Sequence, residues 1–307
     1  MDDKRIPALG EVALGGSGSG ADGEGDGEGD GDGERWPALG LGTWRMGESA
    51  SRRPAEVAAL REAIDIGYRL FDSAEMYGEG GAEEVVGSAL APALRGALLR
   101  DQLFIVSKAY PQHGDPAGLL AACERSLRRL RLDCIDLYLL HWRGSVPLAR
   151  TVQGMQALQR RGWIRHWGVS NFDVADLEEL AIVPGGEACS ANQVYFSLSA
   201  RGPAFDLLPW QRARQMPLMA YSPIDQGALA DHPALREIAA RHGATPAQLA
   251  LAWVLAQPGV MAIPKSASAG RLRENWQARD IVLSAADHEA LDRLFPPASA
   301  KAPLAML

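Results

Sequence analysis

The sequence contains few cysteines, and they form none of the patterns that disulfide frameworks or metal sites use. Of its 307 residues only three are cysteine, at Cys123, Cys134 and Cys189. They are odd in number and widely spaced, which argues against a disulfide-stapled fold and against a cysteine-based zinc site. We therefore expect no bound metal and a reducing compartment, the cytoplasm.

Long apolar runs are also missing. No stretch approaches the roughly 20 residues that a membrane-spanning helix needs. Residues 1–5 are followed by no apolar segment of the kind that a secretion signal carries. These absences predict a soluble, unexported protein with no membrane partner.

Basic residues are absent from one part of the chain, and this accounts for the formal net charge of -7. Seven acidic residues lie there without a basic one, at Asp22, Glu24, Asp26, Glu28, Asp30, Asp32 and Glu34. The rest of the chain holds as many acidic as basic residues. Nothing in this balance indicates a surface that binds nucleic acid.

Residues 15–34 are low in complexity, because glycine alternates there with aspartate or glutamate. Such a segment buries no apolar surface and repels itself, so it is predicted to be a disordered linker. Calcium binding is the alternative, but isolated carboxylates on flexible glycines lack the preorganised geometry of a calcium site. We divide the chain into an N-terminal arm at 1–14, a linker at 15–35 and one folded domain at 36–307.

After the linker, strand and helix patterns alternate along the chain. Helices are predicted at 53–67, 83–90, 116–130, 147–161, 233–241 and 246–256. Strands are predicted at 38–42, 68–71, 104–108, 135–141, 166–169, 191–194, 218–221 and 260–263. Parallel strands need crossover connections, so eight strands separated by helices predict a single-domain (β/α)8 barrel. A Rossmann sheet is disfavoured, because no Gly-x-Gly-x-x-Gly pattern opens a helix after an early strand.

Polar and charged residues stand where several predicted strands end. Asp72 and Tyr77 follow the second strand, Lys108 ends the third, and His141 ends the fourth. In a barrel these ends share one face. A phenol has a pKa of about 10 and is a poor acid by itself. We expect Lys108 to lower the pKa of Tyr77, and Asp72 to keep Lys108 charged.

These four residues resemble the catalytic tetrad of the aldo-keto reductases, with the first two in the run Asp-Ser-Ala-Glu-Met-Tyr-Gly. The similarity extends from Pro37 to the C-terminus. It implies an NADPH-dependent barrel in which Tyr77 is the general acid in carbonyl reduction and His141 orients the substrate oxygen. It also implies that residues 11–14 and 35–39 form a β-hairpin lid across the bottom of the barrel.

The resemblance further implies a cofactor site. Ser170, Asn171 and Gln193 are expected on the nicotinamide carboxamide, and Tyr221 on the face of the nicotinamide ring. Lys265 and Arg271 are expected on a 2′-phosphate, and their two charges favour NADPH over NADH. The other expected cofactor-binding residues are Thr43, Ser222, Ser266, Glu274 and Asn275.

An aromatic, mainly apolar cup is expected at the substrate end, because the family places pocket-lining residues at Trp44, Met76, Tyr110 and Trp142. The segments that follow the fourth and seventh strands look short, which predicts an open and shallow site. The sequence at 141–147 and the tail at 295–304 resemble bacterial reductases of methylglyoxal and related small aldehydes.

Two other functions stay open at this point. A redox-sensing regulatory protein of the same fold, similar to channel β-subunits, would bind the nucleotide with marginal turnover. An aldolase or isomerase barrel would use Lys108 in a Schiff base, but it leaves Ser170, Asn171 and Tyr221 without a role. We expect a monomeric, NADPH-dependent reductase of small aldehydes or dicarbonyls, whose partner is a small-molecule carbonyl substrate.

Overall fold

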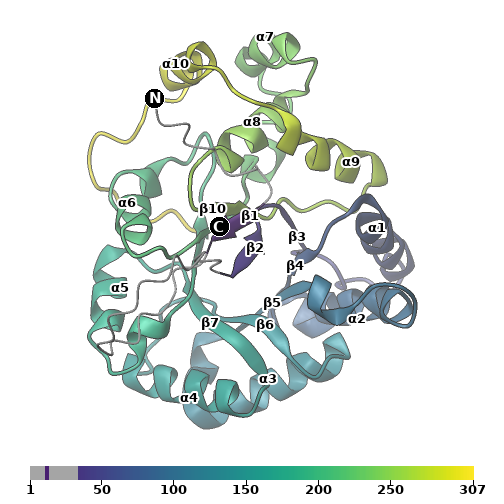
Figure 1. Ribbon diagram of the computed structural model, residues 1–307, viewed down its shortest axis with the longest axis vertical. Helices are drawn as coiled ribbons and strands as arrows, with labels where there is room; N and C mark the ends of the chain where they lie inside the picture. Colours follow the sequence, from purple (N-terminus) through teal and green to yellow (C-terminus); the bar gives the residue numbers. More distant parts are fainter. Residues whose placement is uncertain (1–10, 14–33) are drawn as a thin grey trace, which may run out of the picture.

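Eight parallel strands form the centre of the molecule. The computed structural model describes residues 11–13 and 34–307. Its large sheet has the strand order β10-β9-β8-β7-β6-β5-β4-β3, and every neighbouring pair is parallel. Backbone bridges from Leu39 to Ala262 and from Gly42 to Lys265 join the two outer strands, so the sheet closes (Figure 1). The predicted (β/α)8 barrel is confirmed.

All eight predicted strands are present, with slightly different ends. They are β3 (Gly40–Gly42), β4 (Leu70–Asp72), β5 (Phe104–Ala109), β6 (Ile135–Leu140), β7 (Ile164–Ser170), β8 (Asn192–Tyr195), β9 (Leu218–Tyr221) and β10 (Val260–Ala262). Every residue of β5 and β6 is buried. This is typical of parallel strands that helices cover on the outside and side chains fill on the inside.

Helices surround the barrel (Figure 1). They are α1 (Arg53–Ile66), α2 (Gly81–Leu94), α3 (Pro116–Leu130), α4 (Leu148–Arg160), α5 (Val174–Ala181), α6 (Leu207–Arg212), α7 (Pro233–Arg241), α8 (Pro246–Leu255), α9 (Ala269–Gln277) and α10 (Ala285–Leu294). Helix α3 has the predicted bounds, because Asp115 caps it by accepting from two backbone N–H groups. Within the described residues no helix is long and apolar enough to span a bilayer.

Four helices were not indicated by the sequence pattern, namely α5, α6, α9 and α10. Helix α9 buries only Leu272 and Asn275, and α10 buries only Asp287 and Leu291. So narrow a buried stripe gives almost no apolar periodicity to detect. A capping signal was nevertheless available for α10, since Ser284 and Asp287 form a capping box.

The N-terminal hairpin is present and closes the bottom of the barrel. Strand β1 (Glu11–Ala13) pairs with β2 (Arg35–Pro37) in antiparallel register. Trp36 is fully buried, and its ring centroid lies 4.6 Å from that of Phe104 and 5.2 Å from that of His166. Both partners lie near the amino ends of their strands, so the hairpin covers the face opposite the strand C-termini. The predicted linker falls outside the described residues, apart from Glu34 and Arg35.

Candidate active site

The carboxyl ends of the strands open into a cavity of about 820 Å³. Asp72 is the last residue of β4, Lys108 lies in β5, and His141 follows β6 directly. Asp72, Tyr77 and His141 line the cavity, whereas Lys108 is fully buried behind them. The four residues come together because parallel strands carry their C-terminal residues to one face of a barrel.

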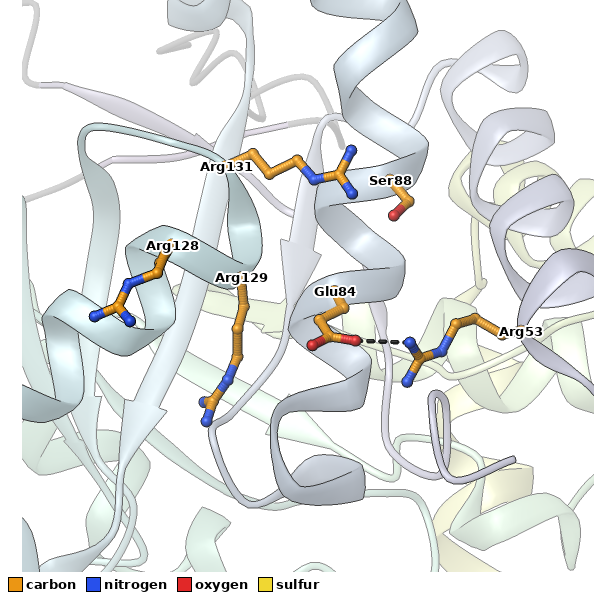
Figure 2. A pocket seen from close by; sticks show the side chains of 6 residues that line it. All are labelled: Arg53, Glu84, Ser88, Arg128, Arg129 and Arg131. Carbon is orange, nitrogen blue, oxygen red and sulfur yellow. Dashed lines mark hydrogen bonds and ion pairs between the residues drawn. The ribbon is translucent and has the colours of Figure 1, made fainter. Parts of the chain in front are cut away.

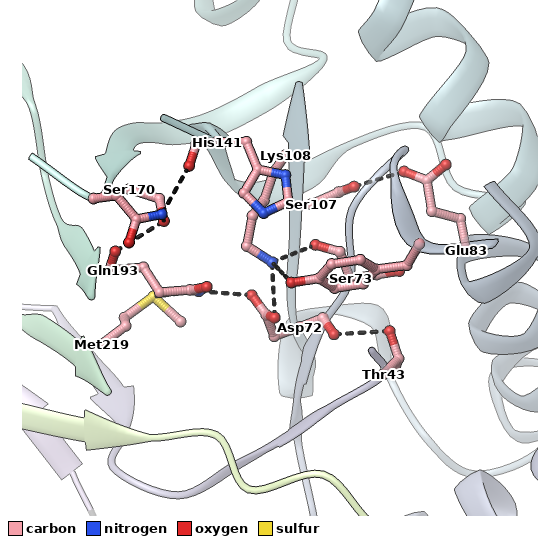
Figure 3. Close-up of polar contacts among 12 residues, drawn as sticks. Thr43, Asp72, Ser73, Glu83, Ser107, Lys108, His141, Ser170, Gln193 and Met219 are labelled. Atoms are coloured by element: carbon pink, nitrogen blue, oxygen red, sulfur yellow. Dashed lines mark hydrogen bonds and ion pairs between the residues drawn. The ribbon is translucent and has the colours of Figure 1, made fainter. Parts of the chain in front are cut away.

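Lys108 is the centre of the polar network (Figure 3). Its Nζ donates to Asp72 Oδ2 at 2.8 Å, to the carbonyl oxygen of Ser73 at 2.8 Å and to the Tyr77 hydroxyl at 3.2 Å. An ammonium has three donors and no acceptor, so these contacts use all of them. The cation is therefore aimed at the Tyr77 oxygen and held there.

Asp72 is fixed by residues from three other strands and their loops. While Oδ2 accepts from Lys108, Oδ1 accepts from Gln193 Nε2 at 2.8 Å. Its carbonyl oxygen accepts from Thr43 Oγ1 at 2.9 Å. Thr43 does not line the cavity; in this structure it holds the backbone of Asp72.

Burial raises the pKa of Tyr77 above the ordinary 10.0 of a phenol. The Lys108 charge and its hydrogen bond lower that pKa, as expected, and the Asp72 charge raises it. The net shift is nevertheless upward, because the loss of solvation outweighs the neighbouring cation. Tyr77 therefore keeps its proton throughout the neutral range.

Burial and charge also set the states of the other two groups. Burial alone lowers the pKa of Lys108, but Asp72 and Tyr77 together raise it above its ordinary value. Burial, followed by the Lys108 charge, lowers the pKa of His141 well below its ordinary value. At neutral pH the site thus contains a charged lysine and a neutral imidazole.

A second polar network lies at the ends of β7, β8 and β9. Ser170 Oγ donates to the carbonyl oxygen of Gln193 at 2.8 Å, and the Tyr221 hydroxyl donates to Asn171 Oδ1 at 3.0 Å. Asn171 Nδ2 in turn donates to the carbonyl oxygen of His141 at 3.2 Å. These residues line the cavity beside the tetrad, so the structure brings together the residues that sequence analysis grouped around a carboxamide.

The far end of the cavity is cationic. It is lined by Lys265, Ser266, Arg271, Glu274 and Asn275, the last three of which belong to α9. Within the described residues neither Lys265 nor Arg271 makes an ion pair. Two exposed cations on one wall of a cavity are suited to binding a ligand dianion.

The predicted substrate residues are divided between the cavity and its edge. Trp44, Met76 and Trp142 line the cavity, whereas Tyr110 does not. Tyr110 packs edge-on against Trp142, with ring centroids 6.0 Å apart at 89°. Tyr110 and Trp142 together are called the rim below.

The coiled segment that follows β9 contributes to the cavity lining. Residues 222–231, between β9 and α7, supply Ser222, Pro223, Ile224, Gln226, Gly227, Ala230 and Asp231 to its lining. The segment turns sharply, with Ser222, Asp225 and Gln226 at positive φ, and Asp225 accepts from Ser199 Oγ at 2.9 Å. Of this segment only Ser222 was predicted to belong to the site, because a coiled segment has no periodic pattern to detect; the open, shallow shape stays a prediction.

Two further parts of the lining were missed by sequence analysis. Arg45 directly follows the predicted Trp44, and its position after the first strand end was the available signal. Met306 and Leu307 come from the tail, whose end lies over the middle of the barrel (Figure 1). No local pattern indicates where an irregular tail will lie.

A second hollow of about 390 Å³ lies outside the barrel, between α1, α2 and α3. Figure 2 shows Arg53 paired with Glu84 there, while the guanidinium groups of Arg129 and Arg131 point apart. Arg129 is held at 3.0 Å by the buried Glu83. The hollow is lined by ion pairs between helices and has no converging set of reactive groups, so the barrel cavity is the candidate site.

Comparison with known proteins identifies the family of the chain. Residues 38–295 match the family model described as the aldo/keto reductase family. Methylglyoxal reductase YeaE of Escherichia coli strain K12 is 48% identical over 276 residues, covering 88% of this chain and 95% of that protein. Glyoxal reductase of Bacillus subtilis strain 168 is 37% identical, covering 84% and 88%.

Solved structures agree with the sequence relatives. The crystal structure of an aldo/keto reductase from Klebsiella pneumoniae in complex with NADP and acetate is 49% identical, with a TM-score of 0.86. The match covers 90% of this chain and 98% of that one. With the barrel, the tetrad and these matches in agreement, the chain belongs to the aldo/keto reductase family.

Proposed function

We propose that this protein reduces small aldehydes and dicarbonyls, such as methylglyoxal, to alcohols with NADPH, and that Tyr77 supplies the proton. The observation that carries the proposal is the Lys108 ammonium, which donates to Asp72 and to the Tyr77 hydroxyl at the wall of a cavity. The substrate class follows from the names of the relatives, since the two compared above are a methylglyoxal and a glyoxal reductase.

The donors around the cavity fit a phosphorylated dinucleotide. Lys265 and Arg271 would hold a 2′-phosphate. The side chains of Ser170 and Asn171 would hold a carboxamide. Gln193 would accept from the same carboxamide through its amide oxygen, because only its nitrogen is used in the contact with Asp72. Tyr221 has one face stacked on Tyr195, at 5.9 Å and 16°. Two Klebsiella pneumoniae relatives of known structure are complexes with NADP or NADPH.

Reduction places negative charge on the carbonyl oxygen, and the tetrad is arranged to meet it. Bound NADPH supplies the hydride to the carbonyl carbon. Tyr77 donates its proton to the carbonyl oxygen, and the Lys108 ammonium stabilises the resulting phenolate at once. Asp72 keeps Lys108 charged, so the cation does not itself lose a proton during the step.

His141 would orient the substrate oxygen as a neutral donor. Its Nδ1 is buried and has no hydrogen-bond partner among the described residues. A buried N–H without an acceptor is costly, so the tautomer with the proton on Nε2 is favoured. That nitrogen is then the donor available on the cavity side, and the low pKa keeps the ring uncharged beside Lys108.

The three free cysteines are compatible with the expected reducing compartment. Cys123 and Cys189 are buried and Cys134 is partly exposed. Burial raises the pKa of the Cys189 thiol to about 12, which keeps it unreactive at neutral pH. We propose the cytoplasm as the location on these grounds.

The test is the loss of NADPH absorbance with purified protein and a panel that includes methylglyoxal and glyoxal, run beside Tyr77→Phe. We expect turnover in the wild type and a fall in kcat of at least about 100-fold in the variant, since a positioned acid contributes that much. NADPH affinity, measured by fluorescence titration, should stay within about twofold.

Tyr138→Phe is the matched control. Tyr138 is also a fully buried tyrosine, and it lies outside the cavity lining, so loss of its hydroxyl should leave turnover and NADPH binding unchanged. Equal losses of turnover and NADPH binding in Tyr77→Phe would show that the assigned role is wrong. Tight NADPH binding without turnover on any aldehyde would favour the redox-sensing protein.

A further inference from the structure

Glu75 lies between two tetrad residues in sequence, yet its side chain does not line the cavity. It stands in the loop that joins Asp72 to Tyr77, and its backbone N–H donates to the carbonyl oxygen of Lys108 at 3.2 Å. Its side chain is only 4% exposed. A carboxylate buried to this degree needs partners, because an unpaired buried charge is strongly unfavourable.

All the partners of the Glu75 carboxylate lie on the segment that carries the rim or on the helix behind it. Oε1 accepts from the backbone N–H of Tyr110 at 2.8 Å and lies 2.7 Å from His113 Nδ1. Oε2 accepts from Arg125 of α3 at 3.0 Å. Oε1 thus ties residues 110–113 to the loop that carries Tyr77, and Oε2 ties α3 to the same loop.

The segment that Glu75 holds is in contact with the other half of the rim. The Tyr110 ring packs edge-on against Trp142, and Trp142 in turn lies 5.0 Å from the His141 ring. Pro111 approaches Gly144 so closely that a Cβ at Gly144 would lie 2.6 Å from Pro111 Cβ. A shift of the Tyr110 backbone must therefore move Trp142 or clash with its loop.

We propose that Glu75 is a positioning residue that sets the distance between the Tyr77 hydroxyl and the rim, and thereby selects substrates by the size of the group attached to the carbonyl. This rests on the proposed function. A small aldehyde bound at Tyr77 need not reach the rim, whereas a larger one extends to Trp142. Loss of the Glu75 contacts should harm the larger substrate more.

The experiment compares kcat/KM for phenylglyoxal and methylglyoxal in the wild type, Glu75→Ala and the control Glu124→Gln. Glu124 lies on the exposed face of α3 and pairs with Arg128 at 3.6 Å. In Glu75→Ala we expect the loss for phenylglyoxal to exceed the loss for methylglyoxal by about fivefold, the equivalent of one ordinary hydrogen bond. Glu124→Gln should leave the ratio unchanged.

A purely structural role predicts a different result. General destabilisation lowers the fraction of active enzyme and reduces both activities equally, so equal losses would overturn the proposal. In a background that already carries Trp142→Ala, Glu75→Ala should reduce kcat/KM for phenylglyoxal and for methylglyoxal by the same factor. The reason is that Glu75 acts on the larger substrate through the rim, which Trp142→Ala has removed. Fully additive losses in the double variant would equally overturn it.

Amide hydrogen exchange provides a readout that does not depend on turnover. In Glu75→Ala the amides of Tyr110 and of residues 112–114 should exchange at least about tenfold faster, while those of β6 stay protected. Unchanged exchange at 110–114 would refute the positioning role. A wild type without turnover would refute the proposed function alone, and this measurement would then decide the role of Glu75.

Arg125→Gln replaces Glu75→Ala if the latter does not fold. The Arg125 side chain is 37% exposed, so its removal leaves no buried cavity while it breaks the contact with Oε2. We again expect a larger loss of kcat/KM for phenylglyoxal than for methylglyoxal and faster amide exchange in the segment that starts at Tyr110, both smaller than in Glu75→Ala. Wild-type behaviour in both measurements would contradict the proposal.

Discussion

Gln193 Nε2 donates to Asp72 Oδ1 at 2.8 Å, which joins β8 to the end of β4 on the opposite side of the barrel. One amide thus faces both the tetrad and the proposed carboxamide site. Because Oδ2 of the same carboxylate holds Lys108, the position of Gln193 affects the cation that supports Tyr77.

Gln193→Leu should reduce both kcat and NADPH affinity. The leucine cannot donate to Asp72, so we expect about a tenfold fall in kcat, the equivalent of one hydrogen bond to a charged group. It also cannot accept from a carboxamide, so we expect about a fivefold fall in NADPH affinity, the equivalent of one hydrogen bond between neutral groups. Steady-state kinetics measure kcat, and fluorescence titration measures NADPH affinity. Gln153→Leu, on the exposed face of α4, is the control, and an unchanged kcat in Gln193→Leu would contradict the coupling.

The pH dependence should be broad. Reduction needs protonated Tyr77, whose pKa burial raises above 10.0, and neutral His141, whose pKa burial lowers well below 6.5. The first group loses its proton only above pH 10.0, and the second gains one only well below pH 6.5. Within these limits kcat/KM for reduction should therefore be flat, as a profile of the free enzyme would show.

Alcohol oxidation should behave in the opposite way. It needs Tyr77 as a base, so its rate should rise with pH and still be rising at pH 10.0. The Lys108 cation lowers the pKa of Tyr77. Its removal in Lys108→Met should therefore move the rise of the oxidation rate to still higher pH. A plateau of oxidation near neutral pH in the wild type would show that another group is the base.

Lys265→Ala should weaken NADPH more than NADH. A charge-assisted bond to a phosphate dianion contributes about 1.5–3 kcal/mol, so the loss for NADPH should be at least about tenfold. NADH lacks that phosphate and should lose little. Isothermal titration with both nucleotides measures this, with Arg241→Ala on α7 as the control. Equal losses for both nucleotides would remove the argument for phosphate recognition.

Trp36→Ala should reduce stability without changing the chemistry. Trp36 is fully buried at the bottom of the barrel, and deletion of such a side chain costs about 3–5 kcal/mol. Since the active site lies at the opposite face, kcat/KM per folded molecule should stay within about twofold. Urea unfolding measures the loss of stability, and kinetics at low temperature measure kcat/KM. A large fall in kcat/KM would contradict the expectation that Trp36 acts on stability alone.

Local sequence was sufficient to predict the eight strands and the residues at several of their ends. Several strands are short apolar runs with a polar residue at or directly after their end, and Asp72, Lys108 and His141 all stand at or near such ends. The geometry of a parallel barrel then brings them together whatever the loop lengths are. The positions of Trp44 and Tyr221 at strand ends likewise predicted that they line the cavity. Glu75 was not singled out, because it is one of several acidic residues in its loop.

The direction of the Tyr77 pKa shift could not be read from the sequence. The neighbours that act on it, Lys108 and Asp72, were both predicted, yet their combined effect is smaller than that of burial. Burial depends on every element that packs around the hydroxyl, and no local pattern records it. The same holds for His141, whose state follows from the solvent it loses.

The sequence by itself predicted the barrel, the four side chains that meet beside the cavity and the two cations of its lining, because strand periodicity and strand ends are local features that topology then gathers on one face. Tertiary structure alone decided that Gln193 holds Asp72, that Glu75 reaches Tyr110 and Arg125, and that residues 222–231 and the tail wall the cavity. These contacts join segments far apart in the chain, and their energies depend on distance and burial, which exist only once the whole chain has packed.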